Sequence, residues 1–246
     1  MYSKTKKIIL LAIIIATLQL LIFSGTSFSG IQYSGHDLTP TGPGQFMYNT
    51  SAADDQICIF CHTPHNAIVI DTAPDNNKLP LWNRSILGNV DGFTVYSSTT
   101  LNAIPDQPRS MTLLCMSCHD GTSALNVVQN FGGGPYTFPV FNVGDPTTIG
   151  EVPGLGINIG ESVKDLSNDH PVSFVFDTNL RDNDAANGVF GLNQPSTISP
   201  LRLFNGRLEC ATCHNPHEQG DAIDGKFPFL RMSNANSEMC IKCHNK

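Results

Sequence analysis

The sequence predicts a mostly irregular fold in which short helices and a small β-hairpin surround something other than an apolar core. Of the 246 residues, only 14% are charged and 8% are aromatic, whereas Gly (21) and Pro (16) are plentiful. Such a composition interrupts long helices and strands and leaves little apolar surface for a core of this size. The net charge of −7 also excludes a basic protein that binds nucleic acid. The eight cysteines and eight histidines are the residues left to organise the chain.

The N-terminal 29 residues have the features of a cleaved export signal. Three lysines within the first seven residues precede an apolar run over 8–23, and serines follow at 27 and 29, where signal peptidase reads small side chains. A retained anchor helix is the alternative, but 16 residues interrupted by Thr17 and Gln19 are few for a membrane span. We therefore expect residues 1–29 to be removed and a single domain to cover 30–246. Loss of three lysines and no acid changes the net charge from −7 to −10.

All eight cysteines belong to four copies of the pattern C-x-x-C-H. The first motif covers 58–62, the second 115–119, the third 210–214 and the fourth 240–244. On a helical turn, positions i, i+3 and i+4 share one face, so two thiols can bond the vinyl groups of a haem while the imidazole reaches its iron. The predicted covalent attachment sites are Cys58, Cys61, Cys115, Cys118, Cys210, Cys213, Cys240 and Cys243. The predicted proximal iron ligands are His62, His119, His214 and His244.

Disulfides and zinc are the other uses of paired cysteines in such a chain. An exported protein can hold four disulfides, and C-x-x-C pairs can bind zinc. Neither use requires a histidine after every second cysteine, whereas covalent haem does. The predicted fold class is therefore a multihaem cytochrome c, mostly irregular with short helices at the haem motifs and a small β-hairpin, built around a stack of four covalently bound haem c groups.

Four histidines lie outside the motifs, and they equal in number the irons that need a second axial ligand. They are His36, His65, His170 and His217. We expect them to be the distal ligands, and ligation by two histidines predicts low reduction potentials, because imidazole donates more strongly than a thioether. The methionines that remain as alternative distal ligands are Met47, Met111 and Met232.

His65 and His217 each follow a motif in the pattern H-x-P-H. Such a histidine starts on the same side of its haem as the proximal ligand, so it cannot bind the opposite face of that iron. Pro64 and Pro216 turn the chain there, because proline disfavours helix at the preceding residue. Each of these histidines is therefore expected to ligate a different haem and to hold two haems close together, as an electron-conducting chain requires.

The mature chain divides into four stretches around these motifs. Residues 30–72 hold the first motif, 73–130 the second, and 207–246 the third and fourth, whose haems we expect to be neighbours. Residues 131–206 lack cysteine and are predicted to be loops around the haems, with one hairpin near 171–178. Short helices are expected to start near Asp54 or Asp55 and near Ser237 or Glu238, where side chains that cap helices precede a motif.

Five segments resemble one family of multihaem cytochromes. They are G-H-D-L at 35–38, C-H-T-P-H-N at 61–66, S-C-H-D-G-T at 117–122, N-D-H-P at 168–171 and C-H-N-P-H at 213–217. In this order they resemble the tetrahaem extracellular nanowire cytochromes of the OmcE type. The resemblance implies head-to-tail filaments in which a histidine of one subunit ligates a haem of the next, and His65 is the best match for that histidine.

The predicted function is electron transfer without catalysis. Four spare histidines for four irons leave no open coordination position, which disfavours the alternative of a multihaem reductase. The implied location is extracellular or on the outer surface, and the alternative is a soluble periplasmic shuttle that supplies all its own ligands. The expected partners are copies of the chain itself, other multihaem cytochromes or outer-membrane conduits as donors, and extracellular acceptors such as metal oxides.

Overall fold

The computed structural model describes most of the chain from residue 30 onward. The described residues are 30–43, 48, 56–68, 80–86, 91–139, 144, 146–151, 164–187, 191–220, 225–226 and 228–245. The predicted export signal at 1–29 lies outside them, as do Met47, Asp54 and Asp55. Within the described ranges, no helix is both long enough and apolar enough to cross a membrane.

Short elements separated by loops make up the described fold. The helices are η1 (Ile57–Phe60), α2 (Ser110–His119), η2 (Ile149–Glu151), α3 (Thr178–Ala186), η3 (Pro195–Thr197), α4 (Cys210–Cys213), η4 (Ala235–Ser237) and η5 (Cys240–Lys242). The strands are β1 (Thr94–Val95), β2 (Val127–Phe131), β3 (Gly134–Thr137), β4 (Asp165–Leu166), β5 (Phe174–Val175) and β6 (Arg207–Leu208). Helical turns thus occur at all four motifs, as predicted.

The strands form three separate two-stranded sheets in the described structure. The hairpin is β2–β3, which turns through Gly132 and Gly133 at positive φ values of 66° and 106° that favour glycine. The hairpin predicted near 171–178 is wrong, because Phe174 pairs with Leu208 of β6 instead. Pro135 disfavours a strand after the glycines, and this signal masked the true hairpin in the sequence.

The buried apolar side chains gather in three small clusters rather than one core. The cluster around η1 and the β2–β3 hairpin includes Phe60 and Phe138, whose ring centroids are 4.8 Å apart. A second cluster packs Phe176 against Leu201, and a third surrounds the fully buried Met116 of α2. Each described cluster lies beside a different part of the row of motifs, which fits a chain wrapped around other groups.

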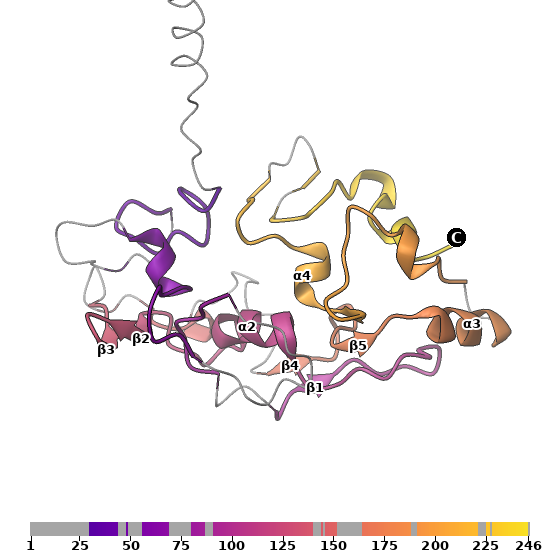
Figure 1. The fold of residues 1–246 in the computed structure, drawn as a ribbon, viewed down its shortest axis with the longest axis horizontal. Coiled ribbons are helices and arrows are strands. Elements are labelled where there is room, and N and C mark those ends of the chain that lie inside the picture. The colour runs from indigo at the N-terminus through magenta and orange to yellow at the C-terminus, as the bar shows by residue number, and fades with distance from the viewer. Residues whose placement is uncertain are drawn as a thin grey trace, which may run out of the picture.

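The four motifs follow one another along the longest axis of the molecule. In Figure 1, η1 lies on the left, α2 in the middle, α4 beyond it, and the C-terminal segment with the fourth motif on the right. Helix α3 projects at the right-hand end, where the Asp177 carboxylate caps it by accepting a 2.8 Å hydrogen bond from the Leu180 amide. The order of the motifs in space is therefore their order in sequence.

Candidate functional site

Each motif forms one helical turn that ends at its histidine. The amide of the motif histidine donates to the carbonyl of the first cysteine over 2.7 Å in the first motif and 3.0 Å in the third and fourth. The second motif lies within α2, so it has the same helical form. This turn places both thiols and the imidazole on one face, as covalent haem attachment requires.

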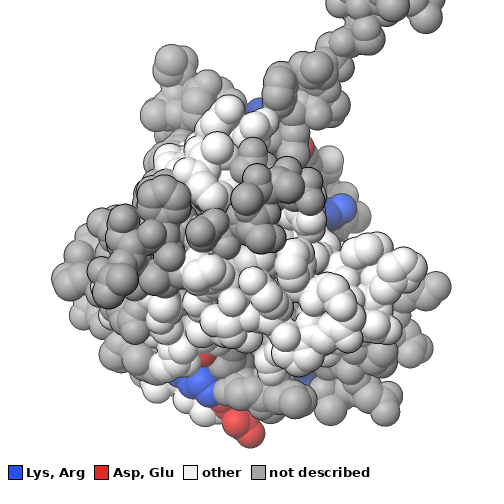
Figure 2. All heavy atoms as spheres, turned by 90° about the vertical axis from the view of Figure 1, so that its left-hand side faces the viewer, with Lys and Arg blue, Asp and Glu red and all other residues white. Residues whose placement is uncertain are grey.

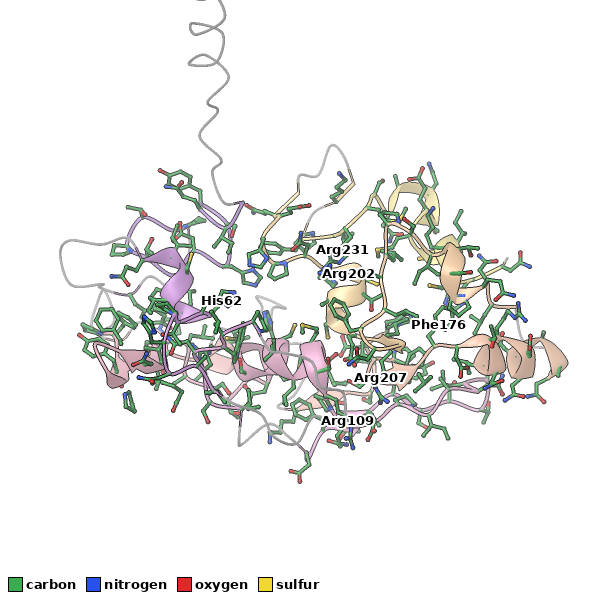
Figure 3. The ribbon with its side chains drawn as sticks, in the orientation of Figure 1. His62, Arg109, Phe176, Arg202, Arg207 and Arg231 are labelled. Atoms are coloured by element: carbon green, nitrogen blue, oxygen red, sulfur yellow. The ribbon has the colours of Figure 1, made fainter. Side chains whose placement is uncertain are left out.

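Residues 81–83, distant in sequence, pair with the main chain at the end of the first motif; this kind of pairing is called a clamp below. Trp82 forms an antiparallel bridge with His62. The amide of Asn83 donates to the Cys61 carbonyl over 2.9 Å, and the amide of Thr63 donates to the Leu81 carbonyl over 2.9 Å. Figure 3 places His62 between η1 and the middle of the molecule.

The same clamp occurs at the third and fourth motifs. His214 forms an antiparallel bridge with Leu230, and the Arg231 amide donates a 2.8 Å hydrogen bond to the Cys213 carbonyl. Arg231, labelled in Figure 3, lies beside α4. His244 bridges to Leu192 in the same antiparallel manner. Three of the four motif histidines are thus fixed by main-chain pairing, while α2 fixes the other.

Main-chain carbonyls also set the tautomer of several imidazoles. The Nδ1–H group of His62 donates to the Pro80 carbonyl, and that of His214 donates to the Pro228 carbonyl over 3.3 Å. His170 makes the same contact with the Pro171 carbonyl over 2.9 Å. A carbonyl only accepts, so these bonds place the proton on Nδ1 and leave Nε2 free to bind a metal.

Three pairs of imidazole rings lie close together, and each pair consists of one motif histidine and one spare histidine. The ring centroids are 6.1 Å apart for His36 and His119, 6.0 Å for His62 and His217, and 6.4 Å for His170 and His244. In each pair the two residues come from distant parts of the sequence.

These separations would leave room for an iron between the two imidazoles. A metal–imidazole bond of about 2.0 Å on each side, plus roughly 1.1 Å from each nitrogen to its ring centre, places the centroids about 6.3 Å apart. A hydrogen bond between the rings would bring them closer than this. A cavity of about 370 Å³ also lies against the first motif, where Cys58, His62 and Pro64 are among its lining residues. The residues present therefore fit haem at three of the four motifs.

His65 and His214 are the two histidines left without such a pairing. Neither residue makes a ring contact of this kind in the described part of the chain, and both are exposed. His214 does lie near His36, and partial burial lowers the pKa of His214. The main chain of His65 is nevertheless fixed, because its carbonyl accepts hydrogen bonds from Thr63 Oγ1 at 2.8 Å and Asn130 Nδ2 at 2.6 Å. One spare ligand and one proximal ligand thus remain, both on the surface.

Thiols of successive motifs lie near one another. Burial, with Cys118 nearby, raises the pKa of Cys61 to about 12, and burial, with Cys243 nearby, raises that of Cys213 to about 11. A direct interaction with Cys210 raises the pKa of Cys115. The first motif is thus near the second, the second near the third, and the third near the fourth.

No disulfide joins any of the eight cysteines, all of which lie in the described ranges. No group of three or more His, Cys, Asp or Glu side chains there is arranged to hold a metal ion directly. The paired thiols instead keep the form of separate C-x-x-C-H turns. This arrangement suits thioether bonds at each turn.

The His36 ring is largely enclosed by the protein. Burial, with a further contribution from nearby His119, lowers its pKa to about 4, so the ring is neutral at pH 7. Its ring stacks on Phe229 with centroids 4.3 Å apart. The Asp37 carboxylate fixes the turn that carries His36 by accepting a 2.9 Å bond from the Tyr33 amide. A neutral imidazole is the form that ligates iron.

Sequence reasoning missed the clamping segments. The first is K-L-P-L at 78–81 and the second is K-F-P-F at 226–229, so a short repeat was there to be found. In both segments the residue after proline has positive φ, 50° at Leu81 and 59° at Phe229. The proline carbonyl is the acceptor for the motif imidazole in each case.

No protein-family model matches this chain, and a search of curated proteins also finds no match.

Proposed function

We propose that this chain is an exported tetrahaem cytochrome that carries electrons and assembles head to tail into extracellular filaments. The observation that carries the proposal is the set of three imidazole pairs at 6.0–6.4 Å, each joining a C-x-x-C-H histidine to a spare histidine. Four copies of the attachment motif in one exported chain independently support covalent attachment of four haems.

The side chains hold and orient the groups that carry the electrons. The thiols of each motif supply two covalent bonds, and the clamped imidazole supplies the proximal ligand. When bound, haem iron supplies reversible one-electron chemistry, with a low potential under two histidine ligands. At the three motifs with paired histidines, both imidazoles would be available to hold the iron, which would leave no coordination site there for a substrate and favours transfer over catalysis.

The closeness of thiols in successive motifs supports a continuous conducting path. Cys61 is near Cys118, Cys115 interacts with Cys210, and Cys213 is near Cys243. Neighbouring attachment sites therefore bring the groups they hold close together in the order of the sequence. The first and fourth motifs are left at opposite ends of the long axis (Figure 1).

The unpaired histidines supply the join between subunits. We assign His65 of one copy to the iron that His214 of the next copy would hold, because these are the two ligands that remain once three pairs are made. The join would therefore run from the first motif of one copy to the third motif of the next. Such a contact uses different surfaces on the two copies and does not close on itself, so it produces a filament. The end of the molecule seen in Figure 2 carries few charged side chains in its described part, as suits a face that packs against another copy.

The test compares His65→Ala with His217→Ala, two variants that remove the same residue type from the same H-x-P-H pattern. Both should retain four covalent haems by mass spectrometry and show one high-spin haem per chain by electron paramagnetic resonance. Only His65→Ala should lose filaments in electron micrographs, since His217 faces His62 within its own chain.

Two outcomes would count against the proposal in different ways. Normal filaments from His65→Ala would refute the bridging role and leave a tetrahaem shuttle. An exported wild-type chain without covalent haem would refute the cytochrome itself.

A further inference from the structure

Gly30 lies against the main chain of the loop that carries His217. It pairs with Glu218 in a parallel bridge, although 188 positions separate them in sequence. A Cβ atom at residue 30 would lie 2.5 Å from the His217 carbonyl oxygen and 3.2 Å from the Glu218 Cα. Contacts shorter than 3.0 Å are essentially never made by real Cβ atoms, and both neighbours here are main-chain atoms that cannot rotate away. Only glycine fits this position without moving the loop.

The main chain is held by hydrogen bonds on both sides of this contact. On one side, Ile31 is buried and its carbonyl accepts a 2.9 Å hydrogen bond from the Ser34 amide. On the other side, the loop is a closed turn in which the Glu218 amide donates to the Asn215 carbonyl over 3.0 Å. The His217 amide also approaches the Asn215 side-chain oxygen at 3.3 Å. A displaced His217 carbonyl therefore carries the rest of the turn with it.

Within this loop, the His217 imidazole is the group that would bind iron. Its ring centroid lies 6.0 Å from that of His62, and the two ring planes are inclined by 15°. Metal–ligand bonds tolerate deviations of only about 0.2 Å. Relief of a 2.5 Å contact needs a larger movement than that, because ordinary van der Waals contact begins at 3.4 Å.

We propose that Gly30 is a positioning residue for the distal ligand His217, and that the absence of a side chain at residue 30 holds this imidazole opposite His62. The inference rests on the proposed function. Residue 30 is also the first residue of the predicted mature chain, so the contact is made by the processed N-terminus. The same segment carries His36, and it therefore supports the axial ligands of two irons.

The test is Gly30→Ala, with Gly35→Ala as the matched control. Gly35 belongs to the same segment, and a Cβ there would meet no atom within 4 Å. Alanine at residue 30 also remains a suitable residue after a signal-peptide cleavage site, and N-terminal sequencing of both variants checks this. The probe is carbon monoxide binding to the fully reduced protein, which requires an axial histidine to dissociate first.

We expect all proteins to retain four covalent haems, and one haem of Gly30→Ala to bind carbon monoxide about tenfold faster than in the wild type. Gly35→Ala should match the wild type. Equal rates in Gly30→Ala and Gly35→Ala would overturn the inference and leave the tetrahaem function intact.

A second comparison covers the case in which Gly30→Ala is exported in low yield. Adding Gly30→Ala to His217→Ala should produce no high-spin haem beyond the one that His217→Ala already has, because both changes act on the same iron. A second high-spin haem in the double variant would show that Gly30 acts elsewhere. A wild-type chain without covalent haem would instead refute the function on which the inference rests.

Discussion

Glu209 is a fully buried acid placed immediately before the third motif. Its carboxylate accepts hydrogen bonds from the hydroxyls of Thr112 and Ser173, and Arg207 Nε lies 3.7 Å away. Burial nevertheless dominates and raises the pKa of Glu209 to about 7, although these hydrogen bonds and Arg207 act in the opposite direction. The folded protein therefore holds a proton that the unfolded chain releases near pH 4.5.

This difference predicts how stability depends on pH. Between about pH 4.5 and 7 the folded state binds more protons, so the free energy of unfolding falls as pH rises, by about 3 kcal/mol in total, and is level above pH 7. Glu209→Gln should remove this slope, because glutamine does not titrate. Guanidinium unfolding of the two proteins at pH 5, 6, 7 and 8 measures it, and an unchanged slope in the variant would contradict the assignment.

For single residues, the sequence named the candidate ligands but not how they pair in space. Counting histidines predicted four spare ligands, and the H-x-P-H pattern predicted that His217 lies near a motif other than its own, which agrees with its position beside His62. The pairing of His36 with His119 and of His170 with His244 depends on loops that cross the molecule. No local pattern encodes such crossings.

Among the elements, the segment over 80–84 joins parts of the chain that are far apart in sequence. Asn83 is fully buried and donates to the Ile59 carbonyl over 2.7 Å. Arg84 Nη1 donates to the Leu125 carbonyl over 2.8 Å, and its Nε group donates to the Ser117 carbonyl over 3.3 Å. The segment thus connects the first motif, the second motif and the start of β2.

Replacing Arg84 by alanine should therefore destabilise the fold strongly. The change leaves several buried carbonyls without donors and removes a side chain that is only 2% exposed, which we expect to cost about 3 kcal/mol or more. The control is Arg181→Ala on α3, whose ion pair is with the exposed Asp182 and should contribute less than about 1 kcal/mol. Denaturation followed by haem absorbance measures both. A loss for Arg84→Ala no larger than that of the control would refute the role of this segment.

Elements were predicted well only where a motif defines them. The C-x-x-C-H spacing predicted a helical turn at each motif, and all four are present. The clamps at Trp82, Leu192 and Leu230 were not predicted, because a single bridge pair leaves no alternation in the sequence for a period of two to reveal. The same limit applies to β5, whose partner β6 lies more than 30 residues away.

At the scale of the whole molecule, the described chain has three small apolar clusters instead of one core. They contain eight, five and three buried residues, respectively. The composition had predicted this deficit, and the motifs lie in a row along the long axis (Figure 1). Under the proposed function, haems bound along this row would replace an apolar core.

It follows that folding should depend on haem attachment. Cys210→Ala removes one thioether bond of the third haem, between the second and fourth motifs, and should lower the haem content below four and broaden or abolish cooperative thermal unfolding. The wild-type chain produced without haem attachment should show no cooperative transition by calorimetry. A sharp transition in that haem-free chain would contradict the view that haems supply the core.

Cryo-electron microscopy of the exported protein tests the central claim most directly, since one map reports haem content, axial ligands and assembly together. The predicted result is a filament with four haems in each subunit, the imidazole pairs at 36/119, 62/217 and 170/244 within one chain, and His65 of one subunit on the iron held by His214 of its neighbour. Single particles in which His65 and His214 find partners within their own chain, or a map without haem density, would contradict it.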